Sequence, residues 1–137
     1  MVTTGYSGTP LLKKLGIKES MSVMLIHEPE NNFGLLEKNI TEQFCKKNEK
    51  PDFIHLFVKT KKDFETGMRK LKSIKPTTSI WVSWYKKSSG IPTDITEDAI
   101  RNYALQNDLV DIKVCAVSDV WSGLKLVVPV AKRSKIN

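Results

Sequence analysis

The chain has 137 residues, of which 40% are hydrophobic and 27% are charged. This length is usual for a single domain, and the hydrophobic share is high enough to bury a core, which excludes a disordered chain. The 22 basic and 15 acidic residues give a formal charge of +7, which favours anionic partners such as phosphates or nucleic acid without choosing between them.

Targeting signals and cysteine pairs are missing from the sequence. No segment is apolar and long enough to span a bilayer, and residues 1–8 lack the basic and apolar stretches of a secretory signal. We therefore expect a cytoplasmic protein with no membrane contact and one domain over residues 1–137, with mobile ends at 1–8 and 132–137. Cys45 and Cys115 are far apart and have no Cys-x-x-Cys partner, which favours buried free thiols over a disulfide or a metal site.

The first predicted element is a short helix. Thr9-Pro10 marks its start, three leucines follow, and Gly16 can end it in the left-handed conformation. Unbroken apolar runs then occupy residues 23–26, 53–58 and 80–82. Runs of this kind are typical of strands that are covered on both faces, as in a parallel sheet.

Helical patterns separate these runs. Apolar residues recur at helical spacing over residues 64–74, and Thr60 stands where a helix cap is expected. After the third run, Asp94 is predicted to cap another helix, with Glu97 at the reciprocal position of a capping box. The segment 41–46 leaves two alternatives open, because it suits either a continued helix or a short edge strand.

The C-terminal part has a different pattern. Strand-like runs at residues 112–117 and 124–130 are joined by a turn around residues 121–123, which is too short for a crossover helix. The last two strands should therefore form an antiparallel hairpin. The alternation of strands and helices before them predicts an α/β fold with a wound, mostly parallel sheet and flanking helices.

Four loops are expected to meet at one edge of this sheet. Ligands of wound parallel sheets usually bind beyond the carboxyl ends of the strands. The loops at that edge begin at His27, Lys59 and Trp84, and the hairpin turn at residues 118–123 reaches the same edge if the preceding strand runs parallel to the others.

The third of these loops is the strongest candidate for binding. Lys86 and Lys87 supply positive charge, Ser88 and Ser89 supply hydroxyl groups, and Gly90 allows close approach of the backbone. A helix N-terminus follows, and such an end favours anions. The order of a Walker loop is missing, and a solvated basic turn is the plain alternative.

The converging loops also offer walls and proton-transfer groups. Trp84 and Trp121 can wall a flat ligand or stack on a base, and Ser122 adds a hydroxyl group beside them. His27 and Asp119 are the candidates for moving a proton, and histidine is the residue type most often used for proton transfer. Edge packing explains the two tryptophans equally well.

Other residues and motifs narrow the possibilities. His55 lies in the middle of a predicted strand, so we expect a core histidine that is satisfied by a hydrogen bond. Asp94 is a possible general base, although the capping role already explains it. The turn after the first strand has no Gly-x-Gly pattern, and Gly-x-Ser-x-Gly, His-Glu-x-x-His and Cys-x-x-Cys are all missing. The sequence therefore favours no metal site and leaves the cofactor unknown.

Nearly the whole chain resembles a family of small, largely bacterial proteins known as a domain of unknown function. The resemblance rests on the segments Gly5-Tyr6-Ser7-Gly8-Thr9-Pro10-Leu11, Lys13-Lys14-Leu15-Gly16-Ile17, His55-Leu56-Phe57-Val58, Trp81-Val82-Ser83-Trp84, Lys86-Lys87, Ser89-Gly90, Thr93-Asp94-Ile95-Thr96-Glu97-Asp98, Lys113-Val114-Cys115-Ala116-Val117 and Val120-Trp121-Ser122-Gly123-Leu124. Only together are these segments specific.

This resemblance implies a Rossmann-like fold, similar to a shortened adenosylmethionine-dependent methyltransferase with its last strands as a hairpin. It also implies a short second strand near residues 41–46 and hence the strand order 2-1-3-4-6-5. It implies no established activity. The missing glycine-rich turn departs from the methyltransferases and leaves adenosylmethionine binding open.

Three hypotheses of function follow. The first is a binding domain for a small anionic ligand, such as a phosphate, nucleotide or carboxylate, at the carboxyl edge of the sheet. The second is a degenerate adenosylmethionine-dependent transferase in which His27 or Asp119 moves a proton. The third is a nucleic-acid-binding protein, which the interspersed acidic residues make less favourable. The sequence indicates neither the oligomeric state nor the biological role.

Overall fold

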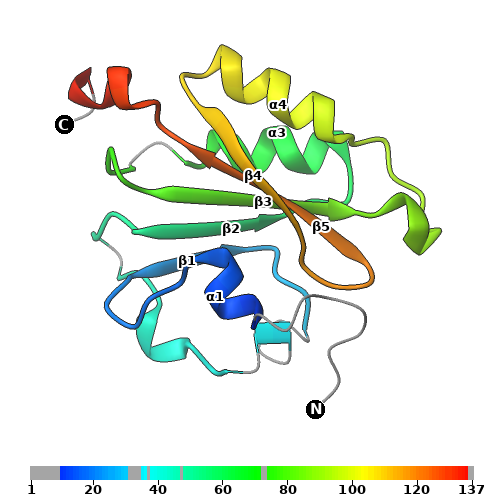
Figure 1. The fold of residues 1–137 in the computed structure, drawn as a ribbon, viewed down its shortest axis with the longest axis horizontal. Coiled ribbons are helices and arrows are strands. Elements are labelled where there is room, and N and C mark those ends of the chain that lie inside the picture. Colours follow the sequence, from blue (N-terminus) through cyan, green and yellow to red (C-terminus); the bar gives the residue numbers. More distant parts are fainter. Residues whose placement is uncertain (1–9, 31–34, 37, 47, 72–73, 136–137) are drawn as a thin grey trace.

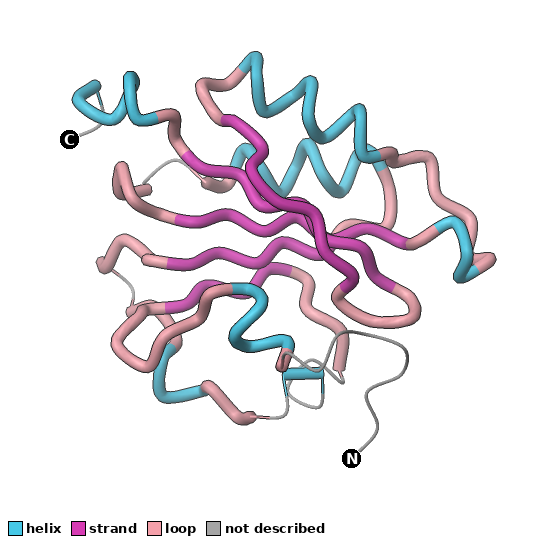
Figure 2. Tube along the Cα trace, viewed as in Figure 1, coloured by secondary structure: helices cyan, strands magenta, loops and turns pink. Residues whose placement is uncertain are grey.

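The structure is a computed structural model that describes residues 10–30, 35–36, 38–46, 48–71 and 74–135. Its five strands form one sheet, with helices on both sides (Figures 1 and 2). The elements in chain order are α1 (Leu11–Leu15), β1 (Val23–Ile26), η1 (Thr41–Gln43), β2 (Phe53–Phe57), α3 (Lys61–Arg69), β3 (Ser79–Tyr85), η2 (Lys87–Ser89), α4 (Glu97–Gln106), β4 (Val110–Ala116), β5 (Trp121–Val127) and η3 (Val130–Lys135), where η marks a 3-10 helix.

The sheet is mixed, and its strand order is β1-β2-β3-β5-β4. β1 pairs with β2 and β2 with β3 in parallel, whereas β5 runs antiparallel to both of its neighbours, β3 and β4. The C-terminal hairpin is therefore confirmed, but the expectation of a mostly parallel sheet is wrong. The order differs from the expected 2-1-3-4-6-5 because the described chain has no second strand near residues 41–46, whereas the other five strands keep their expected places. Half of the four pairings are antiparallel because β5 returns between β3 and β4.

The sixth strand was expected at residues 41–46, and the structure has no strand there. Its first residues form the 3-10 helix η1, and the Asn39 side chain accepts a hydrogen bond from the Thr41 backbone N–H at 2.9 Å. Only Phe44 then bridges to Val23, in parallel, and the Cys45 N–H donates to the Val23 carbonyl at 2.8 Å. A strand does not develop there because the turn leaves too little extended chain beside β1.

The hairpin turns earlier than the sequence pattern predicts. Ser118 fixes the turn because its Oγ accepts hydrogen bonds from the N–H groups of Val120 and Trp121, each at 3.1 Å. The chain is thus already extended at Trp121, and residues 121–123 lie inside β5. The prediction that these residues form the turn is wrong.

Helix caps differ from their prediction in one case. Thr60 caps α3 as expected, with its Oγ1 accepting from the Asp63 N–H at 3.1 Å. The predicted cap of α4 is wrong, because α4 begins after Thr96, whose Oγ1 accepts from the Ala99 N–H at 3.2 Å. The Asp94 carboxylate instead accepts the backbone N–H of Lys61 at 2.7 Å and so satisfies the start of α3.

Side chains alternate between two packed faces of the sheet. We call the side covered by α3 and α4 the α4 face, and the side covered by α1 the α1 face (Figure 1). Leu56 and Leu124 represent the largely aliphatic cluster on the α4 face. Phe53 and Trp81 represent the α1 face, where four of the ten buried cluster residues are aromatic. The apolar runs of the sequence are therefore strands that are buried on both sides, as expected.

The chain after β5 is tied to the rest of the fold. Lys132 and Arg133, which the sequence placed in a mobile end, lie in η3. The Lys132 Nζ is 2.8 Å from an Asp108 carboxylate oxygen, and the Arg133 Nε donates to the Val128 carbonyl at 3.2 Å. Residues 1–8, the other end expected to be mobile, lie outside the described residues. No helix in the described part of the chain has the length and apolarity to cross a membrane.

Candidate functional site

The loops at the carboxyl edge of the sheet are joined by hydrogen bonds. The Lys86 backbone N–H donates to the Val120 carbonyl at 2.8 Å, which connects the third loop with the hairpin turn. The Thr93 hydroxyl donates to the Lys59 carbonyl at 2.7 Å and connects the third loop with the second. The loop after β1 joins them through a shared pocket that His27 lines together with residues of the other three. The double-lysine segment and the hairpin turn thus lie side by side.

A first pocket at this edge surrounds the double-lysine segment, and we call it the Lys87 pocket. It has a volume of about 850 Å³ and lies on the α4 face of the sheet. Its lining residues are Trp84, Tyr85, Lys86, Lys87, Ser88, Thr93, Ile95, Thr96, Glu97, Asp98 and Ser122. Five predicted ligand-binding residues meet here: Trp84, Lys86, Lys87, Ser88 and Ser122.

Ser89 and Gly90 build the turn of this pocket. The Ser89 hydroxyl donates to the Lys86 carbonyl at 2.6 Å and accepts from the Ile91 N–H at 3.2 Å. Gly90 ends η2 at a φ of 74°, in the left-handed region that favours glycine. A Cβ atom at Gly90 would meet nothing within 4 Å, so the backbone conformation and not close packing requires the glycine.

Two carboxylates in the Lys87 pocket are already paired. Arg101 contacts Glu97 at 2.5 Å and Asp98 at 2.9 Å, and it also reaches Asp111 at 3.0 Å. The hydrogen bonds that Arg101 donates to Glu97 and Asp111 raise the pKa of its guanidinium. Because Glu97 and Asp98 occupy the first turn of α4, its positive N-terminal end is already matched. An anion in this pocket would depend on the lysines.

The two tryptophans of the predicted site lie on opposite faces of the sheet. Trp84 is in β3 and packs in the α4-face cluster, whereas Trp121 is in β5 and packs in the α1-face cluster. Both are nearly buried, with 7% and 6% of their surface exposed. They lie in strands and not in loops, and only Trp84 lines the Lys87 pocket. The two indoles therefore do not wall one common cavity.

Trp121 belongs to a second pocket, which we call the His27 pocket. It has a volume of about 620 Å³ and is lined by His27, Glu28, Pro29, Glu30, Lys59, Tyr85, Ile91, Val120 and Trp121. Tyr85 and Trp121 stack with ring centroids 4.6 Å apart. Tyr85 also lines the Lys87 pocket, so the two pockets meet at the end of β3. Sequence analysis missed Tyr85 as a site residue, although it follows Trp81 and Ser83 at alternate positions of β3.

His27 has an unusual backbone for its residue type. Its φ is 57°, a left-handed conformation at the end of β1 that glycine adopts more readily. Strained conformations of this kind cluster at functional sites. The chain therefore makes a left-handed bend after β1 at a histidine, although the sequence has no Gly-x-Gly pattern there. Asp119, the other proton-transfer candidate, lies exposed in the hairpin turn and lines neither pocket.

His55 is a core histidine, as predicted. It is 2% exposed, its Nε2 lies 2.7 Å from the Ser83 hydroxyl, and its ring stacks on Phe57 at 4.0 Å. Burial lowers the pKa of His55 to about 3, so the imidazole is neutral near pH 7. This neutral state fits a structural role on the α1 face.

Metal chemistry finds no support in the described residues. They contain no group of three or more His, Cys, Asp or Glu side chains placed to hold an ion. Cys45 and Cys115 are both free, as expected, and both are partly buried. Burial raises the pKa of each thiol, which makes each less reactive than an ordinary cysteine.

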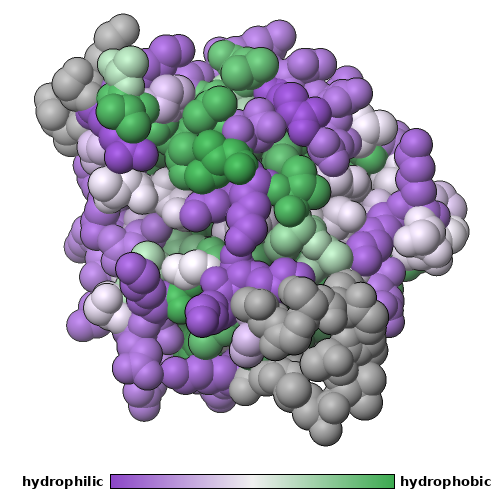
Figure 3. Space-filling model, in the orientation of Figure 1, coloured by the Kyte–Doolittle hydropathy of each residue, from purple (hydrophilic) through white to green (hydrophobic). Residues whose placement is uncertain are grey.

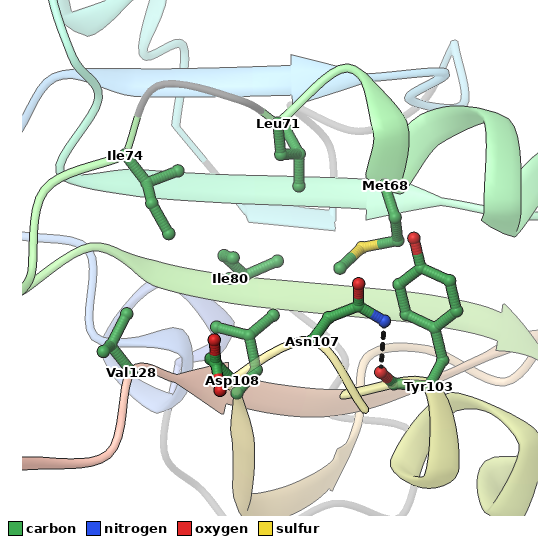
Figure 4. A pocket seen from close by; sticks show the side chains of 9 residues that line it. Met68, Leu71, Ile74, Ile80, Tyr103, Asn107, Asp108 and Val128 are labelled. Atoms are coloured by element: carbon green, nitrogen blue, oxygen red, sulfur yellow. Dashed lines mark hydrogen bonds between the residues drawn. The ribbon is translucent and has the colours of Figure 1, made fainter. Parts of the chain in front are cut away.

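A third cavity lies at the opposite end of the sheet (Figure 4). Its volume is about 300 Å³, and its walls are largely aliphatic, with Ile80 from the start of β3 and Val128 after β5. The polar atoms at its rim are occupied in part, because the Asn107 side chain donates to the Tyr103 carbonyl at 2.7 Å and Asp108 pairs with Lys132. This cavity is separate from the converging loops.

Comparisons with known proteins show the fold. No family model and no curated protein matches the chain. Among solved structures, it is similar to a protein in the NADB-Rossmann superfamily from Streptococcus agalactiae, with a TM-score of 0.53 and 9% identity over 89% of this chain and 69% of that chain. A likeness at this identity shows the fold alone, and the chain has a Rossmann-like α/β fold.

Proposed function

We propose that the protein is a binding domain for a small anionic ligand, such as a phosphate, nucleotide or carboxylate, in the Lys87 pocket. The observation that carries the proposal is the meeting of Lys86, Lys87 and Ser88 with Trp84 in one open pocket at the carboxyl edge. This is the edge where ligands of Rossmann-like folds bind. The size of the pocket is within the range of small-molecule sites.

The charge of the pocket favours an anion. Arg101 pairs with both carboxylates on the rim and so offsets their negative charge. No ion pair joins Lys87 to any residue that the structure describes. An ammonium group and a nearby hydroxyl group are suitable donors to a phosphate or carboxylate oxygen. Ser89 and Gly90 contribute by shaping the turn that presents these donors.

Titration of the indole fluorescence tests this proposal. The probes are inorganic phosphate, pyrophosphate, AMP and ATP, and Trp84 reports binding because it lines the pocket. We expect at least one probe to bind the wild type with saturation. Lys87→Gln should weaken that binding about tenfold, since a charge-assisted hydrogen bond contributes roughly 1.5–3 kcal/mol.

The matched control is Lys62→Gln, which removes the same charge from an exposed position on α3 outside the pocket. It should leave binding unchanged. Equal weakening by both variants would mean that only the overall charge attracts the probe. That result, or no saturable response to any probe, would contradict the proposal.

A transferase that uses adenosylmethionine is a second candidate, favoured by the His27 pocket. Glu28 and Glu30 line this pocket beside the stacked Tyr85 and Trp121. Carboxylates suit the cationic sulfonium and the hydroxyl groups of adenosylmethionine, and aromatic rings suit its base. In this candidate His27 moves the proton. Adenosylmethionine and its demethylated product should then raise the melting temperature of the wild type, and Glu28→Gln should reduce that shift.

A further inference from the structure

Two lysines face each other across the C-terminal hairpin. Lys113 of β4 and Lys125 of β5 are direct partners in the antiparallel register. Lys125 is also the register partner of Trp81, which places the pair on the α1 face. Like charges at opposite positions of a strand pair destabilise it. We call these residues the Lys113–Lys125 pair.

A third lysine and the end of α1 border this pair. The Lys113 Nζ donates to the Lys14 carbonyl at 3.2 Å, and the Lys14 Nζ donates to the Ala116 carbonyl at 3.4 Å. The Lys125 Nζ lies 4.0 Å from the position that a Cβ atom on Gly16 would take. Figure 3 shows hydrophilic side chains near the middle of this side of the molecule, with hydrophobic side chains above them. Positive charge is thus concentrated between α1 and the hairpin.

Among the described residues, the charged side chains of the hairpin strands form ion pairs on one side of the hairpin and not on the other. On the α4 face, Arg101 binds Asp111 of β4 together with Glu97 and Asp98, so every charge in that network has a partner of opposite sign. On the α1 face, no ion pair with a described carboxylate reaches Lys113 or Lys125. The positive excess is therefore local to one side of the hairpin.

Helix capping explains only part of this arrangement. The carboxyl end of a helix attracts cations, and the bond from Lys113 to the Lys14 carbonyl is such a contact. Lys125 donates no hydrogen bond within the described part of the chain, and it is partly buried. Burial lowers the pKa of Lys125, and the nearby Lys113 lowers it further. Capping therefore does not account for Lys125.

We propose that Lys113 and Lys125, with Lys14 beside them, form a binding site for a phosphate group. A phosphate carries enough negative charge to offset two ammonium groups at once, and lysine is a common phosphate ligand. Bound phosphate would replace the repulsion across the strands with attraction. The site lies on the α1 face, apart from the Lys87 pocket, and it does not depend on the function proposed above.

Thermal unfolding at low ionic strength tests the site with pyrophosphate as the probe. We expect pyrophosphate to raise the melting temperature of the wild type by several degrees, because a ligand of the native state stabilises it. The double variant Lys113→Gln/Lys125→Gln should lose the part of this shift that arises at the hairpin and keep any part that arises in the Lys87 pocket. Without pyrophosphate, Lys125→Gln should melt at a higher temperature than the wild type, since the repulsion is removed.

Two control variants separate this site from other effects. Lys62→Gln has the same change of charge and should keep the full pyrophosphate shift. Lys87→Gln should also keep the shift that arises at the hairpin, so failure of the first proposal and failure of this one are distinguishable. A further variant, Lys113→Gln alone, provides the same test if the double variant does not fold.

A single-stranded oligonucleotide distinguishes a polymer phosphate from a free one. If the natural source is nucleic acid, the oligonucleotide binds at least about tenfold more tightly than pyrophosphate, and its affinity falls steeply with added salt. If the source is a small phosphate, pyrophosphate binds as tightly as the oligonucleotide. Equal stabilisation of wild type and double variant, or no stabilisation of the wild type by either probe, would overturn the proposal.

Discussion

Both faces of the sheet are packed, but they differ chemically. Leu56 and Leu124 on the α4 face belong to a cluster dominated by aliphatic side chains, and α3 and α4 cover it. The α1 face holds the stacked aromatic rings together with the His55–Ser83 pair and Lys125. The difference teaches that apolar packing stabilises the α4 face, whereas the α1 face combines packing with buried polar groups that depend on their partners and on pH.

The largest expected effect is a loss of stability from a substitution in the aliphatic cluster of the α4 face. Leu56→Ala removes most of a side chain that is 0% exposed and should lower the free energy of unfolding by about 2–5 kcal/mol, because a cavity is left behind. Denaturant unfolding measures this change. Leu105→Ala, at a position that is 57% exposed on α4, serves as the control and should alter stability by about 0.5 kcal/mol or less. Similar losses in both variants would mean that the aliphatic cluster does not dominate stability.

The next effect concerns pH and the α1 face. The pKa of His55 falls from 6.5 to about 3 on folding, so the unfolded chain binds the extra proton between these values. Stability from this group is complete above pH 6.5 and is lost as the pH falls, by about 1.4 kcal/mol per unit and about 3 kcal/mol by pH 4. Unfolding measured from pH 7 to pH 4 should show this slope.

The control for the pH effect is the double variant His55→Leu/Ser83→Ala, which removes both partners of the buried hydrogen bond. Its stability should change far less with pH over the same range, because its core contains no imidazole. A wild-type slope retained in the double variant would assign the effect to other groups. The pKa of Asp52 is lowered mainly by its hydrogen bond from Lys75, and that adds acid sensitivity only near and below pH 3.8.

The smallest expected loss of stability comes from removing the Ser83 hydroxyl from the His55–Ser83 hydrogen bond. Ser83→Ala leaves the His55 Nε2 without its partner in a fully buried position and should cost about 1–3 kcal/mol. The same Ser83→Ala change in a His55→Leu background should cost much less, since no imidazole is then left unpaired. A double-mutant cycle measures the difference, and additive losses would indicate that the two side chains do not depend on each other.

The sequence predicted the elements better than their assembly. Apolar runs at residues 23–26 and 53–58 identify buried strands because burial on both faces requires apolar residues throughout. The same run does not say where a later strand inserts, and the place of β5 between β3 and β4 was expected only from the resemblance, whose strand order contains it. Tertiary contacts decide that place. The cap of α4 escaped prediction for a similar reason, because Asp94 and Thr96 are both good caps and only the folded loop shows that Asp94 satisfies Lys61.

The candidate site was predicted in part. That several loops meet at one edge follows from the direction of the strands, and the contact between Lys86 and Val120 agrees with it. The opposite sides of Trp84 and Trp121 depend on the register, in which Tyr85 and not Trp84 is the partner of Trp121. A register with a shift of one residue reverses which face each side chain occupies, and the sequence does not fix it without the hairpin turn.

The position of β5 has a consequence for how the protein is made. It is the final strand in the described sequence, yet it is an interior strand of the sheet, and β4 pairs with no other strand. During synthesis, a nascent chain that has not passed Trp121 presents the free edge of β3 and leaves β4 without a neighbour. Exposed edges of this kind invite pairing with other chains. The sheet is therefore completed only after β5 has been made, and truncation within this strand would favour aggregation over a smaller stable fold.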